Sequence, residues 1–266
     1  MEYEIRPVDY RKDIMMVVSN EFIMAVHPQE NEMGVFAMKL FRLAIAQCRM
    51  KDKRFYSYEF KVSDLTDLVG INSSNIYRDA QKMCLFLMKT VLMKGKAERK
   101  QKWELKHIFE KCSYNPENGV ITILFHEDMT ELFLHLTRFS RFTQVEIGQL
   151  LSIKTRYAIR LFEYIHMRLM RVLPHADHAV ELYISCDELR QITGTDTMKT
   201  YDHLSHLKEK VLLPSIAEIE KAAEWKIICT NAKDGRKVTG FNLEIWSEAG
   251  YRMIEKLKAK GLFSDE

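Results

Sequence analysis

The sequence predicts an α+β fold of two tandem domains related by an internal duplication, and three observations support this prediction. Residues 65–70 (LTDLVG) align with residues 189–194 (LRQITG), which lie 124 positions later. A tyrosine follows the last glycine of each segment by seven residues, at Tyr77 and Tyr201. Beyond each tyrosine, apolar residues recur at helical spacing, and a strand–turn–strand pattern follows. A repeat of this kind predicts two copies of one structural unit.

Each copy is expected to begin with a short helix that has typical capping residues at its two ends. Ser63 and Ser185 stand just before these helices, where a hydroxyl can accept a hydrogen bond from an otherwise unpaired amide. Gly70 and Gly194 stand at their ends, where glycine adopts the left-handed conformation at little cost. We therefore expect a short helix, a tight turn and a longer helix in each copy, which is a helix-turn-helix.

The longer helix of each copy is expected to have one apolar and one polar face. Its apolar positions recur at i, i+3 and i+7, so they should face a core. They are Ala80, Met83 and Leu87 in the first copy and Leu204, Leu207 and Val211 in the second. One match of this kind is weak, because any two helices joined by a turn produce it, whereas two in the same register are more specific. The alternative is a generic bundle of amphipathic helices.

A β-hairpin is predicted after each helix-turn-helix. In the first copy, residues 103–114 and Val120–Phe125 have strand character around a turn that contains proline and glycine. In the second copy, residues 225–230 and 238–246 flank a loop that contains Asp-Gly, a strong hairpin signal. A helix-turn-helix followed by a hairpin is a winged helix. The sequence therefore predicts two tandem winged-helix domains.

Length and composition agree with two globular domains. The chain has 266 residues, of which 47% are hydrophobic and 29% charged, so it is expected to be globular and not disordered. A leading helix is expected in each domain, at residues 36–48 and 153–170, because apolar residues recur there at helical spacing. We place the boundary near Phe139, which gives an N-terminal domain at residues 1–138 and a C-terminal domain at residues 139–266.

Several other classes of protein are disfavoured by what the sequence lacks. It has no apolar run long enough to span a bilayer and no signal peptide, so we expect a cytoplasmic protein without membrane association. Its five cysteines are scattered without a CxxC pair, which supports neither a disulfide framework nor a zinc site. His203 and His206 share a helix face, but no third ligand is near, so we expect no metal and no cofactor. No phosphate-binding GxxxxGK[ST] loop and no nucleophile elbow occurs, and an enzyme is not expected.

The charge distribution points to nucleic acid more clearly than the net charge does. The net charge is only +3, but residues 78–111 hold ten Lys and Arg against four Asp and Glu. A basic segment beside a helix-turn-helix fits neutralisation of DNA phosphates, which supplies much of protein–DNA affinity. The alternative is a solvated charged surface.

The side chains expected to contact DNA lie on the outer faces of the two longer helices and on the wings. A recognition helix fits the major groove and meets base edges with its polar side chains, while cations on a wing hold phosphates. Asn75 and Arg78 are the preferred base readers, because each can make two hydrogen bonds to one base. The candidates are Ser74, Asn75, Arg78 and Lys82 in the N-terminal domain, Lys199, Thr200, His203, His206 and Lys210 in the C-terminal domain, Lys233, Arg236 and Lys237 on the second wing, and Lys94, Lys96, Arg99 and Lys100 on the first. Solvated surface is the alternative for any one of them.

An ordered set of stretches covers most of residues 139–246. It comprises KTRYAIRLFE at 154–163, ELRQITG at 188–194, residues 201–207, VLLPSIAEI at 211–219 and GRKVTGF at 235–241. In order and spacing, this set resembles the iteron-binding plasmid replication initiators of the Rep 3 superfamily, which are tandem winged-helix proteins. The opening VVSNEF at 17–22 is also similar to the start of that family, so the resemblance covers most of the chain. Two small departures, Phe162 for Tyr and Ser215 for Ala, fall at helix-packing positions.

The resemblance implies a function and a set of partners. Such initiators bind direct repeats, called iterons, in a plasmid origin, help to open the duplex, and recruit the host initiator and the replicative helicase. Their C-terminal winged helix is expected to be the main sequence-specific DNA-binding domain. Their N-terminal winged helix also contacts DNA and forms a homodimer, which binds an inverted repeat in the operator and represses the initiator's own gene. The monomer is the initiating form.

Two other functions were weighed. A transcription regulator with two winged helices shares every feature read from the residues themselves, and only the family resemblance favours an initiator. A rolling-circle nickase is disfavoured, because such enzymes bind a metal through His-x-His and this chain contains no His-x-His.

Overall fold

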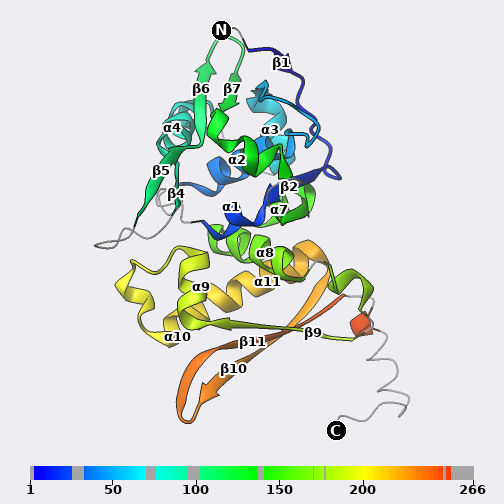
Figure 1. Cartoon of the computed structure of the whole chain (residues 1–266), viewed down its shortest axis with the longest axis vertical. Coiled ribbons are helices and arrows are strands. Elements are labelled where there is room, and N and C mark those ends of the chain that lie inside the picture. The colour runs from blue at the N-terminus through cyan, green and yellow to red at the C-terminus, as the bar shows by residue number, and fades with distance from the viewer. Residues whose placement is uncertain are drawn as a thin grey trace. The chain divides into compact units, whose positions relative to one another are not determined.

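The computed structural model of the chain describes residues 3–25, 33–69, 76–94, 102–136, 141–169, 171–176, 178–247 and 250–252. The chain divides into two compact units, Met1–Arg156 and Tyr157–Glu266, and each is treated by itself (Figure 1). The division lies later than the predicted boundary at residues 138 and 139, because strand β8 (Phe142–Glu146) pairs with β2 (Met15–Ser19) of the first unit. Among the described residues, no helix is long and apolar enough to cross a membrane.

The first unit combines a mixed sheet with a helix-turn-helix. Its remaining elements are β1 (Ile5–Arg6), α1 (Asn20–Met24), α2 (Val35–Ala46), β3 (Ser57–Lys61), α3 (Val62–Val69), α4 (Ile76–Lys89), β4 (Val91–Lys94), β5 (Glu104–His107), β6 (Phe109–Asn115), β7 (Val120–Phe125), η2 (Glu127–Met129), α5 (Thr130–Phe133) and α7 (Ile147–Ser152). The main sheet has the strand order β1-β3-β7-β6, and β4 and β5 form a separate hairpin.

Phenylalanine side chains from helices and strands fill the core of the first unit. The ring of Phe22 packs edge-on against Phe41 and Phe133, with centroid distances of 5.7 and 5.1 Å. The ring of Phe125 stacks on Phe109 at 5.3 Å and meets Phe133 at 5.1 Å. Aromatic pairs at these distances add to the free energy of apolar burial. They hold α1, α2 and α5 against the β6–β7 hairpin.

The second unit has one three-stranded antiparallel sheet and a helical layer. Its elements are α8 (Arg156–Leu169), η3 (Leu173–His175), β9 (Val180–Ser185), α9 (Cys186–Thr193), η4 (Lys199–Tyr201), α10 (Leu204–Leu207), η5 (Lys208–Leu212), α11 (Leu213–Ala223), β10 (Trp225–Asp234) and β11 (Lys237–Ser247). The strand order is β10-β11-β9, and the buried face of the sheet carries Leu182, Ile184, Phe241, Leu243 and Ile245. Alternate residues of a strand point to one face, which explains the apolar alternation along β11.

The predicted duplication is visible in the strand order. In both units the strand before the helix-turn-helix pairs with the last strand of the following hairpin, so β6-β7-β3 corresponds to β10-β11-β9. The short helices α3 and α9 are offset by the 124 positions seen in the sequence. Among the described residues, the first unit has strands without a counterpart in the second, namely the edge strand β1, the β2–β8 pair and the hairpin β4–β5 between its second helix and β6. Two winged-helix units therefore share a common plan, and the first is the more elaborate.

Two local predictions for the first unit were wrong. Residues 103–114 do not form one strand, because the chain changes partner at the fully buried Ile108: β5 pairs with β4, and β6 pairs with β7. Ser63 is not the N-cap of α3, because the helix already begins at Val62, the residue before Ser63. The Val62 side chain is buried. The Ser63 hydroxyl instead lies 3.1 Å from Oδ1 of Asp64, to which it donates a hydrogen bond. The leading helix α2 is confirmed within two residues at each end.

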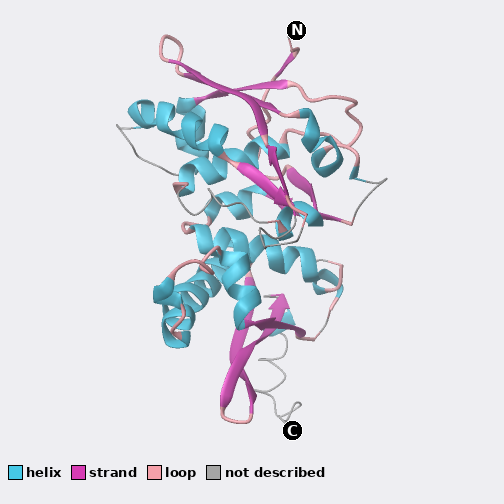
Figure 2. Ribbon diagram, turned by 60° about the vertical axis from the view of Figure 1, so that its left-hand side comes forward, coloured by secondary structure: helices cyan, strands magenta, loops and turns pink. Residues whose placement is uncertain are grey.

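In the second unit the leading helix is shorter than predicted. It begins at Arg156, since Ile153 has an extended backbone and ends α7. The hairpin strand β10 is longer than predicted, because pairing with β11 continues past Thr230 as far as Asp234. The hairpin therefore projects well beyond the helices of this unit (Figure 2).

Candidate nucleic-acid interface

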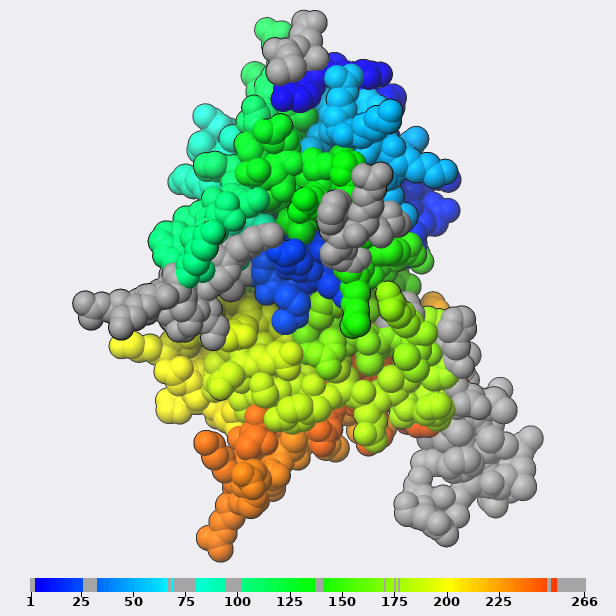
Figure 3. All heavy atoms as spheres, viewed as in Figure 1, coloured from blue at the N-terminus to red at the C-terminus, as the bar shows by residue number. Residues whose placement is uncertain are grey.

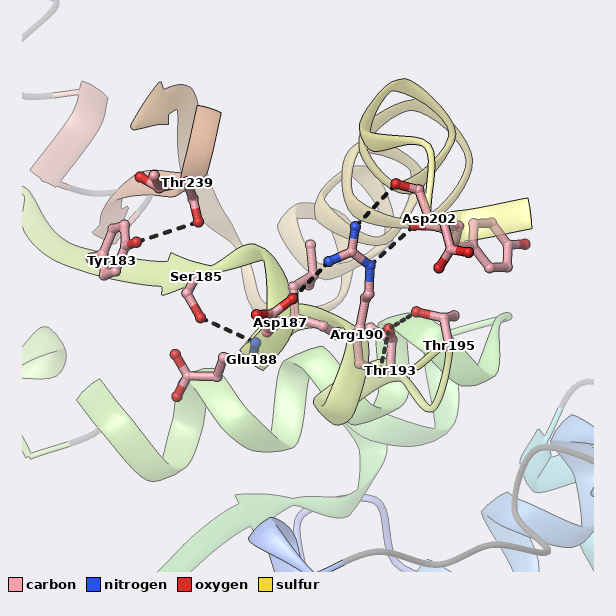
Figure 4. Close-up of polar contacts among 11 residues, drawn as sticks. Tyr183, Ser185, Asp187, Glu188, Arg190, Thr193, Thr195, Asp202 and Thr239 are labelled. Atoms are coloured by element: carbon pink, nitrogen blue, oxygen red, sulfur yellow. Dashed lines mark hydrogen bonds and ion pairs between the residues drawn. The ribbon is translucent and has the colours of Figure 1, made fainter. Parts of the chain in front are cut away.

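The turn of the second helix-turn-helix is built as the sequence predicts. Ser185 caps α9, since its Oγ accepts a hydrogen bond from the amide of Glu188 at 3.1 Å. Gly194 ends the helix with a left-handed backbone, φ 65° and ψ 33°. The hydroxyls of Thr193 and Thr195 lie 3.0 Å apart beside this glycine, and the Thr195 amide returns to the Arg190 carbonyl at 2.9 Å (Figure 4). The end of α9 therefore has a fully hydrogen-bonded turn.

Arg190 connects the first helix of the motif to the beginning of the second. Its Nε donates to the Tyr201 carbonyl at 3.1 Å and its Nη2 donates to the Asp202 carbonyl at 3.3 Å. Its Nη1 donates to Oδ1 of Asp187 at 2.9 Å, one turn back along α9 (Figure 4). A guanidinium presents several donors in one rigid plane, so it can fix a loop through two carbonyls at once. This side chain sets where the recognition helix begins.

Arg190 is not among the residues predicted to contact DNA, although the sequence contains a signal for its role. In the aligned segments, Arg190 occupies the position of Thr66 in the first copy. Thr66 donates from its hydroxyl to the Ser63 carbonyl at 2.6 Å, so its one donor is used within its own helix. A change from a short hydroxyl to a long cation at an otherwise matched position indicates an additional contact in the second copy.

Tyr201, one of the two tyrosines that revealed the repeat, packs against the leading helix. Its ring meets that of Tyr157 edge-on at a centroid distance of 6.2 Å, and the two hydroxyls lie 3.4 Å apart. Two contacts therefore hold the η4 turn at its last residue, Tyr201. Arg190 binds the Tyr201 carbonyl, and Tyr157 packs against the Tyr201 side chain.

The recognition segment is helical from Leu204 to Ala223 but is not one uniform helix. It comprises α10, a wider π turn in η5, and α11. Pro214 lies in the first turn of α11, directly after the π turn. A proline ring clashes with the carbonyl four residues earlier, here that of Lys210, and a wider turn relieves this clash. The π turn therefore has a cause in the sequence.

The candidate base-reading residues of the second unit do not all lie on this helix. Lys199 and Thr200 were expected on its outer face, but they precede it, in the short η4 turn. His203 is the residue before α10, and His206 lies on α10 with its Nδ1 at 3.1 Å from the Thr200 carbonyl. Lys210 is exposed on η5. All five face solvent at least in part and line the entry and first two turns of the recognition segment.

The two histidines are close to each other, with ring centroids 5.5 Å apart. Within the part of the chain that the structure describes, no group of three or more His, Cys, Asp or Glu residues could hold a metal ion. His203 is exposed and His206 half-buried at the start of the recognition segment.

The wing places three cations at its tip. Asp234 pairs with Lys237, so Gly235 and Arg236 form the two-residue loop, and Gly235 has the positive φ of 59° that such a loop requires. Lys233, Arg236 and Lys237 are all exposed. Figure 3 shows the hairpin tip standing clear of the rest of this unit, where it can reach a phosphate backbone.

The recognition segment and the wing are joined by a side-chain hydrogen bond. Lys208 on η5 donates from Nζ to Oδ1 of Asn231 on β10 at 2.7 Å. This bond fixes the helix relative to the strand that leads to the wing tip. Helix and wing can therefore present one positively charged surface of defined shape.

The corresponding residues of the first unit are described only in part. Lys82 is exposed on α4, and Arg78 lies in the same helix, whose backbone is described there. Lys94 was predicted on the first wing, but it is the last residue of β4, which pairs with β5 in a hairpin separate from β6–β7, the counterpart of the second unit's wing. Ser74, Asn75, Lys96, Arg99 and Lys100 lie outside the described residues.

Comparison of the sequence with protein families decides the relationship. Residues 15–166 match the family described as "Initiator Replication protein, WH1", and residues 185–245 match "Initiator Rep protein, WH2". The chain belongs to the initiator replication protein family. Each match contains one helix-turn-helix and strands of its sheet, so both units of this initiator replication protein are winged-helix domains, as the sequence predicts.

Among solved structures, this initiator replication protein is similar to the Pi initiator protein in complex with iteron DNA. The two share 21% sequence identity over 88% of this chain and 98% of the other, with a TM-score of 0.70. At this identity the similarity supports the fold alone. Domains 2 and 3 of RctB align over 80% of this chain and 81% of theirs, with 11% identity and a TM-score of 0.47, and no argument rests on them. No curated protein matches the chain.

Proposed function

We propose that this protein initiates plasmid replication by binding direct repeats, or iterons, in the plasmid origin. It then helps to open the duplex and recruits the host initiator and the replicative helicase. The observation that carries the proposal is the pair of initiator-type winged-helix domains at residues 15–166 and 185–245, together with the similarity in fold to the Pi initiator protein that was solved with iteron DNA.

The second domain supports the proposal physically. Its recognition segment exposes donors of hydrogen bonds, including Lys210, that can meet base edges in the major groove. Its wing tip carries Arg236 and Lys237, whose charges suit phosphates on either side of that groove. A base-reading helix combined with a phosphate-binding wing gives both specificity and affinity. The first domain adds a second helix-turn-helix, which binds a further stretch of DNA.

A dimer and a monomer are proposed to have different tasks. The dimer forms through the N-terminal domain, binds an inverted repeat at the operator and represses the protein's own gene. The monomer binds the direct repeats and initiates. The protein works in the cytoplasm without a cofactor and without cleaving DNA, which agrees with the lack of a His-x-His sequence.

A gel-shift titration tests the proposal. Purified protein is added to duplex DNA from the region flanking its own gene, with random duplex as competitor at physiological salt. A ladder of shifted bands, one for each direct repeat and resistant to competitor, is the expected result. The same assay is applied to the double variant Arg236→Ala/Lys237→Ala, which removes two cations from the wing tip. Its matched control is Lys221→Ala, which removes a cation from the last turn of α11.

The second candidate function is a dimeric transcription regulator, which the same two winged helices would suit. A single shifted band on an inverted repeat, without a ladder on any direct repeat, would favour the regulator and contradict the initiator. Equal competition by random duplex would contradict sequence-specific binding of either kind.

A further inference from the structure

Two of the five cysteines lie together at the junction of a helix and a strand in the first domain. Cys84 belongs to the buried face of α4, on which Ala80, Met83 and Leu87 are also buried. Cys112 is half-buried on β6, opposite the fully buried Ile123 of β7. Helix α4 packs against β6 (Figure 1), and the Cys112 thiol stands close enough to Cys84 to lower the pKa of the Cys84 thiol.

The second domain has a contact between the same helix position and the corresponding strand. Lys208 stands 124 positions after Cys84, the offset of the repeat, and it donates to Asn231 on β10 at 2.7 Å. Strand β10 takes the place of β6 in the shared strand order. In the sheet register Cys112 corresponds to Cys229, so Asn231 lies two residues nearer the hairpin tip. In the first domain the helix and the strand meet through two sulfur atoms, so their contact can become covalent.

We propose that Cys84 and Cys112 form a reversible disulfide that fixes α4 on β6 and makes DNA binding by the first domain sensitive to oxidation. The control of DNA binding rests on the function proposed above, whereas the formation of the disulfide does not. A disulfide joins its sulfur atoms at about 2.05 Å, which is shorter than any thiol hydrogen bond, so its formation draws α4 toward β6. The chain segment that it closes contains the last turn of α4 and the strands β4 and β5.

The chemistry requires a two-electron oxidant, and a hydroperoxide is the class we infer. The Cys84 thiolate attacks one peroxide oxygen, which gives a sulfenic acid on Cys84 and releases water once the leaving oxygen is protonated. The Cys112 thiol then attacks the Cys84 sulfur, and a second water leaves. Two thiols lose two electrons and two protons, and hydrogen peroxide is reduced to two waters.

Cys84 is the better nucleophile of the pair. The hydrogen bond from Cys112 lowers the pKa of the Cys84 thiol, and a thiolate is the reactive form of cysteine. The same hydrogen bond, together with burial, raises the pKa of Cys112. Burial raises the pKa of the other three thiols, Cys48, Cys186 and Cys229, so they should react more slowly.

The disulfide is tested on the full-length protein without DNA. Reduced protein is exposed to a small excess of hydrogen peroxide, quenched with N-ethylmaleimide, digested without reduction and analysed by mass spectrometry. We expect a peptide pair linked through Cys84 and Cys112, which dithiothreitol separates. The variant Cys112→Ser should abolish the pair, and Cys229→Ser should retain it. Circular dichroism of the reduced variants verifies that the half-buried position 112 tolerates serine.

Unlinked Cys84 and Cys112 after oxidation, or a disulfide between two copies of the chain, would overturn the proposal. The consequence for DNA is measured by comparing oxidised and reduced protein on the flanking repeats. We expect oxidation to weaken binding by about tenfold, dithiothreitol to restore it, and Cys112→Ser to be insensitive. Equal affinity of the linked and reduced forms would overturn the regulatory role. Failure of the reduced protein to bind the repeats would contradict the proposed function and leave the disulfide result intact.

Discussion

Arg190 reaches out of one helix and holds the turn that starts the next, with its Nε 3.1 Å from the carbonyl oxygen of Tyr201. The same guanidinium also reaches the carbonyl of Asp202 at 3.3 Å. Both carbonyls belong to the short passage between the turn of the helix-turn-helix and α10. The position of the base-reading surface therefore depends on a side chain that is not itself among the base-reading candidates.

Replacing Arg190 by alanine should weaken specific DNA binding without removing a phosphate contact. The two hydrogen bonds from this charged donor to the carbonyls of Tyr201 and Asp202 are lost, along with that to Asp187, so the start of α10 is no longer fixed. We expect the affinity for the cognate repeat to fall roughly tenfold, which corresponds to about 1.4 kcal/mol, while the affinity for random duplex changes little. Fluorescence anisotropy titrations on both duplexes at several salt concentrations measure this.

The matched control for that prediction is Gln191→Ala, an exposed neighbour on the same helix. It should bind both duplexes as the unmodified protein does. If Arg190→Ala instead lowered the salt dependence and reduced the affinity for both duplexes equally, Arg190 would be a phosphate contact and the positioning role would be wrong.

The wing makes a different prediction, because its cations are expected to act on the DNA backbone. Changing Arg236 and Lys237 to alanine should weaken binding to every duplex. The slope of log K against log salt should become shallower by about 0.9 for each lost phosphate contact. Lys221→Ala, which also removes a positive charge, serves as the control. A slope that stays unchanged in the wing variant would refute the assignment of these residues to phosphates.

Local signals in the sequence were read correctly where the structure depends on neighbouring residues only. Ser185 and Gly194 fulfil their predicted roles because a cap and a left-handed turn involve hydrogen bonds within a few residues. The Asp-Gly pair likewise located the hairpin, since the geometry of a two-residue loop is set by the loop itself. These elements, with the repeat, were enough to predict two winged helices.

The errors arose where distant contacts decide the outcome. The sequence around Ile108 has strand character throughout, but the fully buried Ile108 lies where the chain passes from one strand partner to another. The start of the recognition helix was placed too early, at Lys199, because Arg190 holds the preceding turn through backbone carbonyls. Contacts between a side chain and a remote carbonyl leave no periodic trace in a sequence. The candidate DNA contacts could thus be placed near the recognition segment, but the side chain that fixes the start of this segment could not be predicted.

A glycine on β11 gives a prediction about stability. A Cβ at Gly240 would lie 2.5 Å from the Ile184 carbonyl oxygen and 2.7 Å from Cε2 of Tyr183, whose ring covers this position. The strands would have to separate, so Gly240→Ser should lower the free energy of unfolding by about 1–3 kcal/mol. Urea titration followed by circular dichroism measures this. Gly34→Ser is the control, since a Cβ there meets nothing within 4 Å. Equal stability of both variants would contradict the close approach of β9 and β11.

A buried tyrosine in the first domain predicts how stability depends on pH. The side chain of Tyr58 is fully buried, and its hydroxyl donates to the Gln47 carbonyl at 3.2 Å. Burial raises the pKa of Tyr58 above its ordinary value of 10.0. Below that value both the folded and the unfolded chain carry the proton. Above it the unfolded chain loses the proton while the folded chain keeps it, so this residue's contribution to stability declines as pH rises.

The variant Tyr58→Phe separates this effect from all other titrations. Near neutral pH it should be less stable by about 1 kcal/mol, because the hydrogen bond to Gln47 is lost. Above pH 10 the difference should shrink by up to about 1.4 kcal/mol per pH unit, since phenylalanine has no proton to release on unfolding. Urea unfolding of both proteins at about pH 8 and about pH 11 measures the two differences. A difference that stays constant or grows at the higher pH would contradict the retention of the proton by folded Tyr58.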